Sequence, residues 1–481
     1  MDTVRRLTKN ISVLFLSDIL SYIFAFFTLT YSARYLGVEG FGTLSLALAF
    51  AAVFTFFLDL GTDTFITREI ARDYSLAEGY VANMIPLRII TSLVMLGLIF
   101  LISHIIHYNQ ETIVIIMIIA VYTVFSTFAQ IFFDIFAAYE KFEYTSVGFL
   151  LFNILLLVGI LLVIRYGYNI IVISSVYVIA EIIILLYAYI ICRWKFLPIN
   201  YSKLNKLINW GKWKELIKES LPFSITSMSF YIYTWADTLL LSILISTEVV
   251  GIYSAAYRLI LIVLFIPGIF ASAIFPAMSR YYYTSKDSLK IAFEKILKIC
   301  ILIAIPMAVG TTLIANKIIL LIYGKAFLGS VIALQILIWS SVFTFSRTGY
   351  SNVMAASNMQ LTVTKLVIVA VIFNIILNLL VIPIYSYIGA AIVTVLTEAL
   401  ILILFVHTLK SEFSVSRSTK INLIKGVLAS IIMGIAIYYF NNLNLFLIIL
   451  LGALIYVVCL ILLRVLDEDE ILMIKSLFNK F

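Results

Sequence analysis

The sequence consists mainly of apolar runs of about 20 residues, separated by short segments that hold Gly, Pro and charged residues. An α-helix needs a run of about this length to cross a bilayer, where every backbone hydrogen bond must be made internally. Only 12% of the 481 residues are charged, about half the fraction usual in soluble proteins. We therefore expect an all-α polytopic membrane protein without a large soluble domain.

Hydropathy predicts fourteen membrane-spanning helices. They are expected near 11–32, 40–60, 83–104, 112–138, 145–165, 169–191, 221–245, 250–277, 291–315, 328–352, 359–382, 386–408, 421–440 and 444–463. The first run follows Arg5, Arg6 and Lys9 and is too long for a signal-peptide core, so it is expected to be retained as the first span.

The positions of the basic residues predict the orientation. Of the 33 Lys and Arg residues, only Arg34, Arg165, Lys317 and Lys325 would lie in outer loops if the N-terminus is inside. Because cytoplasmic loops carry an excess of Lys and Arg, both termini are expected in the cytoplasm and the protein in the inner (cell) membrane. The same bias explains the formal charge of +8 without nucleic-acid binding.

Two halves of the chain resemble one another. EGFGTLSLA at 39–47 corresponds to EVVGIYSAA at 248–256, and Phe-Asn-Ile recurs at 152–154 and 373–375. The repeat unit is then six spans. Since six is even, both copies enter the membrane from the same side, which implies a pseudo-twofold axis along the membrane normal.

This repeat predicts the domain organisation. Residues 1–191 are expected to form an N-lobe of spans 1 to 6, and 221–408 a C-lobe of spans 7 to 12. Residues 409–481 hold spans 13 and 14 and a cytoplasmic tail. The lysine-rich segment 192–220 is predicted to be a cytoplasmic amphipathic linker on the membrane surface. Trp194, Trp210 and Trp213 are its expected interfacial anchors.

Charged residues within the predicted spans mark candidate functional positions. They are Asp18, Arg88, Asp134, Glu181, Asp237, Arg258, Arg347, Lys365 and Glu398. Charge at a helix centre costs about 2.5–3.5 kcal/mol on insertion, so such residues face a cavity or a partner. Asp237 and Arg258 are each about ten positions from the turn between spans 7 and 8. They either form a structural ion pair, or Arg258 is released to bind a phosphate when Asp237 takes up a cation.

The stretches ARYLGVEGFGTLSLALAF (33–50) and LDLGTDTFITREIAR (58–72) resemble the N-terminal signature of the polysaccharide exporter family. These are the O-antigen-type (Wzx-like) lipid-linked oligosaccharide flippases of the multidrug/oligosaccharidyl-lipid/polysaccharide (MOP) flippase superfamily. The resemblance implies a MATE-like fold with two six-helix lobes around a cavity that opens alternately to each side. It implies transfer of a polyprenyl-diphosphate-linked oligosaccharide, such as an O-antigen repeat unit, from the cytoplasmic to the outer leaflet. A lipid II flippase and a multidrug/cation antiporter are the alternatives within the superfamily.

Three groups of residues are candidates for this transport. Arg34, Arg88 and Arg258 are candidates for the diphosphate headgroup, because a guanidinium donates two hydrogen bonds to phosphate at once. Candidate gate or ion-pair residues are Asp18, Asp59, Arg68, Glu69, Glu181 and Glu398.

The third group is a candidate coupling site, made of Asp237, Asn374, Asn378, Thr394 and Thr397. Oxygen ligands with one carboxylate suit Na⁺, and the arrangement resembles the C-lobe sodium site of lipid II flippases, with Asn378 where an acid can occur. A proton is the alternative coupling ion, and ordinary hydrogen bonding between helices is the alternative role for the polar residues.

A membrane enzyme, such as a polysaccharide polymerase or ligase, is a different class of function. The outer loops are short, and the sequence has no paired-carboxylate, GxSxG or P-loop pattern, so an enzyme is not expected. No cofactor is expected beyond the coupling ion. The expected partners are the lipid-linked oligosaccharide, the bilayer and the polysaccharide polymerase machinery, with the transporter itself a monomer.

Overall fold

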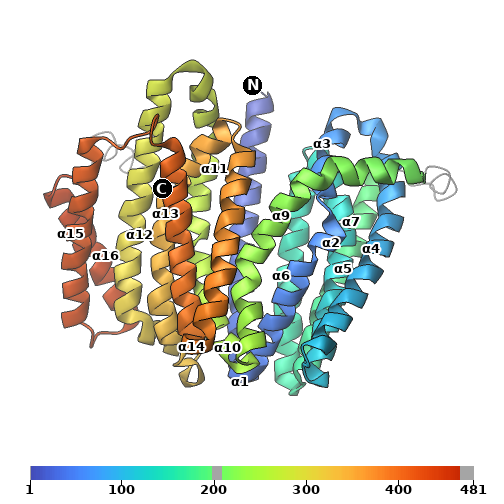
Figure 1. Ribbon diagram of the computed structural model, residues 1–481, viewed down its shortest axis with the longest axis horizontal. Helices are drawn as coiled ribbons and strands as arrows, with labels where there is room; N and C mark the ends of the chain where they lie inside the picture. Colours follow the sequence, from blue (N-terminus) through green and yellow to red (C-terminus); the bar gives the residue numbers. More distant parts are fainter. Residues whose placement is uncertain (1, 198–207, 466–481) are drawn as a thin grey trace. The chain divides into compact units, whose positions relative to one another are not determined.

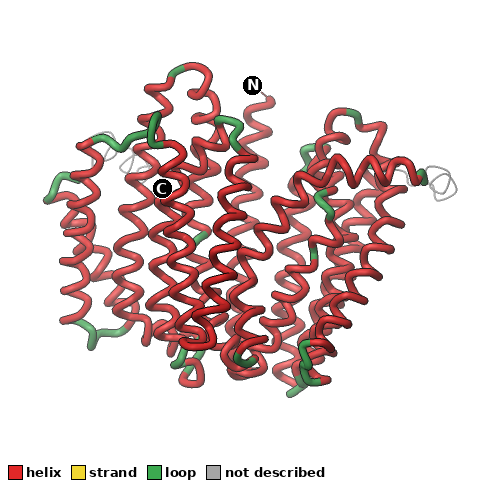
Figure 2. The backbone as a smooth tube through the Cα atoms, viewed as in Figure 1, coloured by secondary structure: helices red, strands yellow, loops and turns green. Residues whose placement is uncertain are grey.

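The computed structural model describes residues 2–197 and 208–465, and this part of the chain is helical with no strand (Figures 1 and 2). The first half contains α1 (Asp2–Phe54), α2 (Phe56–Asp59), α3 (Thr62–Arg72), η1 (Tyr74–Leu76), α4 (Ala77–Ile105), α5 (Gln110–Ala138), α6 (Phe142–Tyr166), α7 (Ile170–Lys195) and α9 (Trp210–Leu244). The second half contains α10 (Thr247–Val263), α11 (Phe265–Thr284), α12 (Lys286–Ile322), η2 (Lys325–Phe327), α13 (Ser330–Ala356), α14 (Gln360–Leu409), α15 (Arg417–Tyr439) and α16 (Leu445–Leu462).

The chain divides into two compact units, residues 1–251 and 252–481, with the division inside α10. In the first unit, α5 packs against α1, α4 and α7, while α6 packs against α1 and α7. In the second unit, α12 packs against α13 and α15, and α13 also packs against α14. The predicted all-α polytopic class is confirmed.

Two of the long helices are each interrupted by a residue outside helical geometry. In α1 the interruption is Gly37 (φ 68°, ψ −172°), and in α14 it is Ser386 (φ 53°, ψ −138°). Gly37 lies in the predicted turn between spans 1 and 2, and Ser386 is the first residue of predicted span 12, directly after the predicted turn. Glycine suits such a backbone because it has no Cβ, whereas Ser386 holds a conformation that side chains normally avoid.

Within the described residues, eleven helical segments are long and apolar enough to cross a membrane. The segment Ile19–Asp59 contains Gly37, and Gln360–Leu409 contains Ser386, so each can hold two of the predicted spans. Predicted span 7 lies in α9, which is not among the eleven. The protein is therefore a multi-pass membrane protein, while the count of fourteen stays a prediction.

Helix α9 joins the second part of the predicted linker to predicted span 7 without a break at residue 220. Residues 198–207 and the Trp210 side chain lie outside what the structure describes. Figure 1 shows that the first part of α9 lies across the ends of neighbouring helices and that its second part runs alongside α1. Pro222 in the interior of α9 lacks a backbone N–H, so one hydrogen bond of the helix is missing at this position.

The expectation that Trp213 anchors the chain in the membrane interface is wrong. This side chain is 7% exposed and packs with Leu216 in the core of the first unit. Its Nε1 donates to Asn83 Oδ1 of α4 at 3.1 Å, and the Asn209 backbone N–H donates to the same oxygen at 2.8 Å. The start of α9 is thus fastened to α4, because Asn83 supplies a buried acceptor. Trp194, by contrast, is exposed, and its anchoring role stays a prediction.

Candidate functional site

A tight turn between α2 and α3 forms the frame of the candidate site. Leu60 (φ 48°) and Gly61 (φ 73°) are both left-handed, so the chain reverses within two residues. A Cβ at Gly61 would stand 2.5 Å from Ser220 O and from Ser224 N of α9. Since real Cβ atoms do not approach backbone that closely, only glycine fits here, and the turn lies directly against α9.

The turn places two carboxylates near one another. Asp59 ends α2, and its Oδ1 accepts from the Asp63 backbone N–H of α3 at 3.3 Å. The Thr62 hydroxyl donates to the Asp59 carbonyl oxygen at 2.5 Å. Asp59 and Asp63 are both half-buried, so both side chains contact solvent as well as the packed helices.

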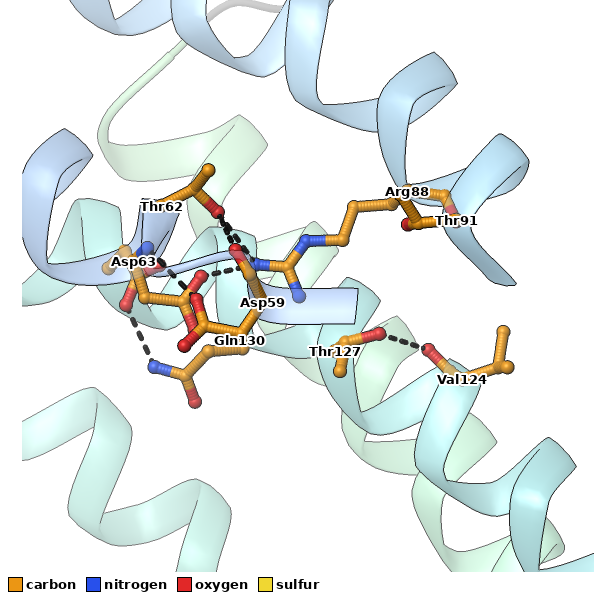
Figure 3. A network of polar contacts seen from close by, with 9 residues as sticks. Asp59, Thr62, Asp63, Arg88, Thr91, Val124, Thr127 and Gln130 are labelled. Atoms are coloured by element: carbon orange, nitrogen blue, oxygen red, sulfur yellow. Dashed lines mark hydrogen bonds and ion pairs between the residues drawn. The ribbon is translucent and has the colours of Figure 1, made fainter. Parts of the chain in front are cut away.

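Arg88 extends from α4 toward this pair (Figure 3). It is 0% exposed, and its Nη2 forms an ion pair with Asp63 Oδ1 and lies 3.5 Å from the Thr62 hydroxyl. Within the described residues, its Nε and Nη1 have no hydrogen-bond partner. Buried donors without partners are costly, so this guanidinium retains capacity to bind a further oxygen.

A third carboxylate comes from α5. Asp134 is 6% exposed, and its Oδ1 accepts from Gln130 Nε2 at 2.8 Å. Asp134 lies within Coulombic range of Asp59, Asp63 and Arg88, so three carboxylates interact electrostatically with one guanidinium. The Tyr231 hydroxyl of α9 also lies within Coulombic range of Asp59, Asp63 and Arg88. The excess of carboxylates favours binding of a cation or proton here, because buried negative charge is unfavourable without compensation.

The structure therefore brings Asp59 and Arg88 into one cluster, which we call the Arg88 cluster: Asp59, Thr62, Asp63, Arg88, Gln130 and Asp134. Sequence reasoning named Asp59 and Arg88 as candidates but missed Asp63. The available signal was the spacing of Asp59 and Asp63, which are four positions apart in LDLGTDTFITREIAR. Which carboxylate would pair with Arg88 depends on packing between helices, and no local pattern encodes it.

The solvent-exposed face of α3 carries the other charges of the 58–72 motif. The Arg68 Nε lies 3.0 Å from Glu69 Oε1, and Arg72 Nη1 lies 3.1 Å from the same oxygen. Both arginines are exposed, so these pairs are solvated and each contributes about 0–1 kcal/mol. At the end of α3, Ser75 donates its N–H and hydroxyl to Asp73, which holds the pKa of that carboxyl below its usual range.

In the second unit, Glu398 pairs with Arg347. The Arg347 Nε donates to Glu398 Oε2 at 3.0 Å, joining α13 to α14, and Glu398 is 5% exposed. Glu398 was a predicted ion-pair residue, while Arg347 was not singled out as its partner. Since one partner is buried, the pair fixes the relative register of the two helices.

The asparagines of the candidate coupling site form a network of their own. Asn378 Nδ2 donates to Asn374 Oδ1 at 3.0 Å, and Asn374 Nδ2 lies 3.3 Å from the Thr397 hydroxyl. The Thr394 hydroxyl lies 3.1 Å from the Tyr253 hydroxyl of α10. In this arrangement the Asn374 side-chain oxygen already accepts one hydrogen bond, so a cation would have to share this oxygen with the Asn378 amide.

The remaining predicted residues occupy varied environments. Arg34 is exposed, Glu181 is 5% exposed, and the Asp18 side chain lies outside the described part. Asp237 is buried in the first unit, whereas Arg258 belongs to the second unit and lies within Coulombic range of the Tyr323 hydroxyl. Among the described residues, no three His, Cys, Asp or Glu side chains are grouped as a metal site would need.

Comparisons with known proteins agree with this architecture. The model of the family described as "polysaccharide biosynthesis protein" matches residues 7–282. The chain is 33% identical to "Probable flippase AglR" of Haloferax volcanii over 181 residues, covering 37% of this chain and 38% of that protein. It is 24% identical over 421 residues to "Capsular polysaccharide biosynthesis protein CapF" of Staphylococcus aureus, covering 85% of this chain and all of CapF.

Solved structures show the same fold. The inward closed conformation of the lipid II flippase MurJ superimposes with a TM-score of 0.79 at 18% identity, over 94% of this chain and 98% of MurJ. An inward-facing multidrug resistance MATE transporter of the MOP superfamily gives a TM-score of 0.66 at 15% identity, over 82% and 95%. At these identities the likeness shows the fold alone. The MATE-like fold expected from the sequence is confirmed by these structures, and the expected polysaccharide family is confirmed by the family model. AglR, MurJ and the MATE protein are named as flippases or transporters.

Proposed function

The chain belongs to the polysaccharide biosynthesis protein family, and from this premise we propose that it is a flippase for a polyprenyl-diphosphate-linked oligosaccharide. Family membership is the observation that carries the proposal. The names of AglR and CapF, a flippase and a capsular polysaccharide biosynthesis protein, support it. The alignment with AglR spans less than half of that protein, so its activity supports the transport class rather than a particular sugar.

In this proposal the cargo moves from the cytoplasmic to the outer leaflet of the inner membrane by alternating access, with both termini cytoplasmic. The Lys and Arg bias of the loops supports the orientation. The transporter acts as a monomer and delivers its cargo to the polysaccharide polymerase machinery. The lobes are the proposed domains 1–191 and 221–408, joined by the 192–220 linker and followed by 409–481.

The headgroup is proposed to bind Arg34, Arg88 and Arg258. Arg88 is paired with Asp63, and Asp59 and Asp134 lie within Coulombic range of it. A diphosphate would be repelled by those carboxylates unless they were neutralised. We therefore propose that Arg88 contacts the headgroup only after Asp59 or Asp134 has taken up a proton, which would link cargo binding to the coupling ion.

The coupling ion itself is proposed to be Na⁺ or a proton. Asp237 with Asn374, Asn378, Thr394 and Thr397 remains the proposed Na⁺ site in the second half of the repeat. The Arg88 cluster supports a proton instead, because its three carboxylates have one cationic partner. The ion pairs of Glu398 and Glu69 are proposed to act in gating, together with Asp18 and Glu181.

A clean chromosomal deletion tests the proposed function. The mutant should accumulate lipid-linked oligosaccharide that stays inaccessible to an impermeant periodate reagent in spheroplasts, while its synthesis continues. Restoring the unmutated gene should make the oligosaccharide accessible again. Accumulation of peptidoglycan precursors instead would indicate the lipid II alternative, and increased drug sensitivity with normal precursors would indicate the antiporter alternative. Normal surface polysaccharide in a strain without a redundant flippase would refute the proposal.

A further inference from the structure

A cavity of about 470 Å³, lined mainly by charged and polar residues, lies between the start of α12 and the start of α15 in the second unit. Three of its lining residues are lysines of α12: Lys290, Lys295 and Lys298. Lys298 is 4% exposed, which is unusual for a side chain that loses much favourable hydration when buried. The volume is within the range of small-ligand sites, about 300–1,000 Å³.

One carboxylate in this cavity, Glu294, accepts hydrogen bonds from the start of α15. Glu294 Oε1 accepts from the Ser416 backbone N–H at 3.1 Å. Its Oε2 accepts from the Ser416 hydroxyl at 2.5 Å and from the Thr419 hydroxyl at 2.6 Å. Glu294 thus binds the N-cap residue Ser416 and joins the start of α15 to α12.

The positive charges of Lys290 and Lys295 are less completely balanced. Lys290 is within Coulombic range of Glu294, but among the described residues neither Lys290 nor Lys295 forms an ion pair. The remaining carboxylate of the lining is Asp287, which is exposed in the first turn of α12. Three lysines therefore share this cavity with two carboxylates, Glu294, which is hydrogen-bonded to the start of α15, and exposed Asp287.

We propose that this cavity binds the phosphate group of an anionic ligand, with a membrane lipid headgroup as its natural source. The lysines supply point charges, and Ser418 and Asn422 add neutral hydrogen-bond donors to the lining. A cation is repelled by three ammonium groups, and a neutral sugar would find no aromatic ring in the lining to stack on. Basic pockets between membrane helices on the cytoplasmic side hold phospholipid headgroups in this way.

The predicted topology is consistent with a lipid source. It places the α11–α12 and α14–α15 connections on the cytoplasmic side, where anionic lipids face the protein. A free phosphate ion has the same charge and oxygen acceptors, so the two sources must be separated by experiment. The site is independent of the Arg88 cluster, which belongs to the other unit.

The full-length protein in nanodiscs tests the site. As the fraction of phosphatidylglycerol in phosphatidylcholine discs rises, the thermal midpoint of the protein should rise. The phosphatidylglycerol fraction that gives half of the full increase measures the affinity. Lys290→Gln and Lys298→Met should each raise that fraction about fivefold, since each basic residue near an anionic surface contributes on the order of a factor of five. Lys286→Gln is the matched control, because Lys286 is exposed on the same helix and does not line the cavity.

A second arm adds inorganic phosphate to pure phosphatidylcholine discs. If phosphate alone raises the thermal midpoint and Lys290→Gln removes the effect, the cavity binds phosphate and its ligand is a soluble phosphate rather than a lipid headgroup. If Lys298→Met folds poorly, the response of Lys290→Gln still tests the site, because Lys290 is half-exposed and its replacement should not disturb folding. The proposal fails if neither ligand shifts the unmutated protein, or if Lys286→Gln weakens the response as much as Lys290→Gln does.

Discussion

Gly42 and Gly251 meet backbone to backbone in a reciprocal contact. A Cβ at Gly42 would stand 1.9 Å from the Thr247 carbonyl oxygen, and a Cβ at Gly251 would stand 2.0 Å from the Val38 carbonyl oxygen. Gly42 and Gly251 are equivalent in the sequence repeat, and so are Val38 and Thr247. A contact in which each residue meets the equivalent of its own neighbour is what a local twofold relation produces. The repeat inferred from EGFG and EVVG thus has a structural counterpart.

This contact predicts that alanine is not tolerated at either glycine. Gly42→Ala and Gly251→Ala should each lower the free energy of unfolding by about 1–3 kcal/mol, because the backbones must separate to admit a methyl group. Gly97→Ala is the matched control, since a Cβ there meets nothing within 4 Å. Thermal midpoints of the purified variants measure the difference. Equal midpoints for all three variants would contradict the close approach.

The Arg88–Asp63 pair predicts a large loss of stability when the cation is removed. Arg88→Met should cost about 3–5 kcal/mol, because it leaves Asp63, Asp59 and Asp134 without their shared partner. Arg68→Gln, which affects only a solvated pair, should cost at most about 1 kcal/mol.

A double-mutant cycle separates this pair from general damage. Arg88→Met combined with Asp63→Asn should cost less than the sum of the single changes, since the residues share one interaction. The free energy of unfolding of all four proteins is measured by denaturation in the same detergent. Strict additivity would mean that the pair does not contribute to stability.

The proposed headgroup site predicts a charge-specific loss of transport. Arg258→Ala should abolish or strongly reduce oligosaccharide export, and Arg258→Lys should reduce it less, because lysine keeps the charge but not the two-pronged donor geometry. Export is measured as surface polysaccharide at matched expression. If Arg258→Ala exports normally, Arg258 is not a headgroup ligand.

The proposed coupling site predicts a response to sodium. Na⁺ should raise the thermal midpoint of the purified protein relative to K⁺, and Asp237→Asn should remove the effect. Asn374→Ala should weaken it, because Asn374 joins the hydrogen-bonded network that includes Asn378 and Thr397. No sodium response in the unmutated protein would rule out the sodium site and leave the proton as the coupling ion.

The predicted topology is tested by cysteine labelling. After replacement of Cys192, Cys300 and Cys459, a single cysteine at Glu248 should react with an impermeant maleimide in whole cells, and one at Lys218 should not. Both positions are exposed in the structure, so reactivity reports the side of the membrane. The reverse pattern would place the termini outside.

The sequence by itself determined the class of fold, the turn at Gly37 and the family. These properties depend on local features: the length of each apolar run, the charges between runs, and glycine at Gly37, where the backbone leaves helical geometry. The repeat could be recognised for the same reason, since equivalent residues such as Gly42 and Gly251 keep their spacing in the chain.

Only the tertiary structure decided which polar groups meet. Arg88 pairs with Asp63 across 25 positions, and Arg347 pairs with Glu398 across 51. Trp213 is buried against Asn83 rather than exposed at an interface. An amphipathic pattern shows which side of a helix is apolar, but protein and lipid are equally apolar surroundings. Which of them covers a given side chain depends on helix crossings, and these are set by contacts between residues far apart in the sequence.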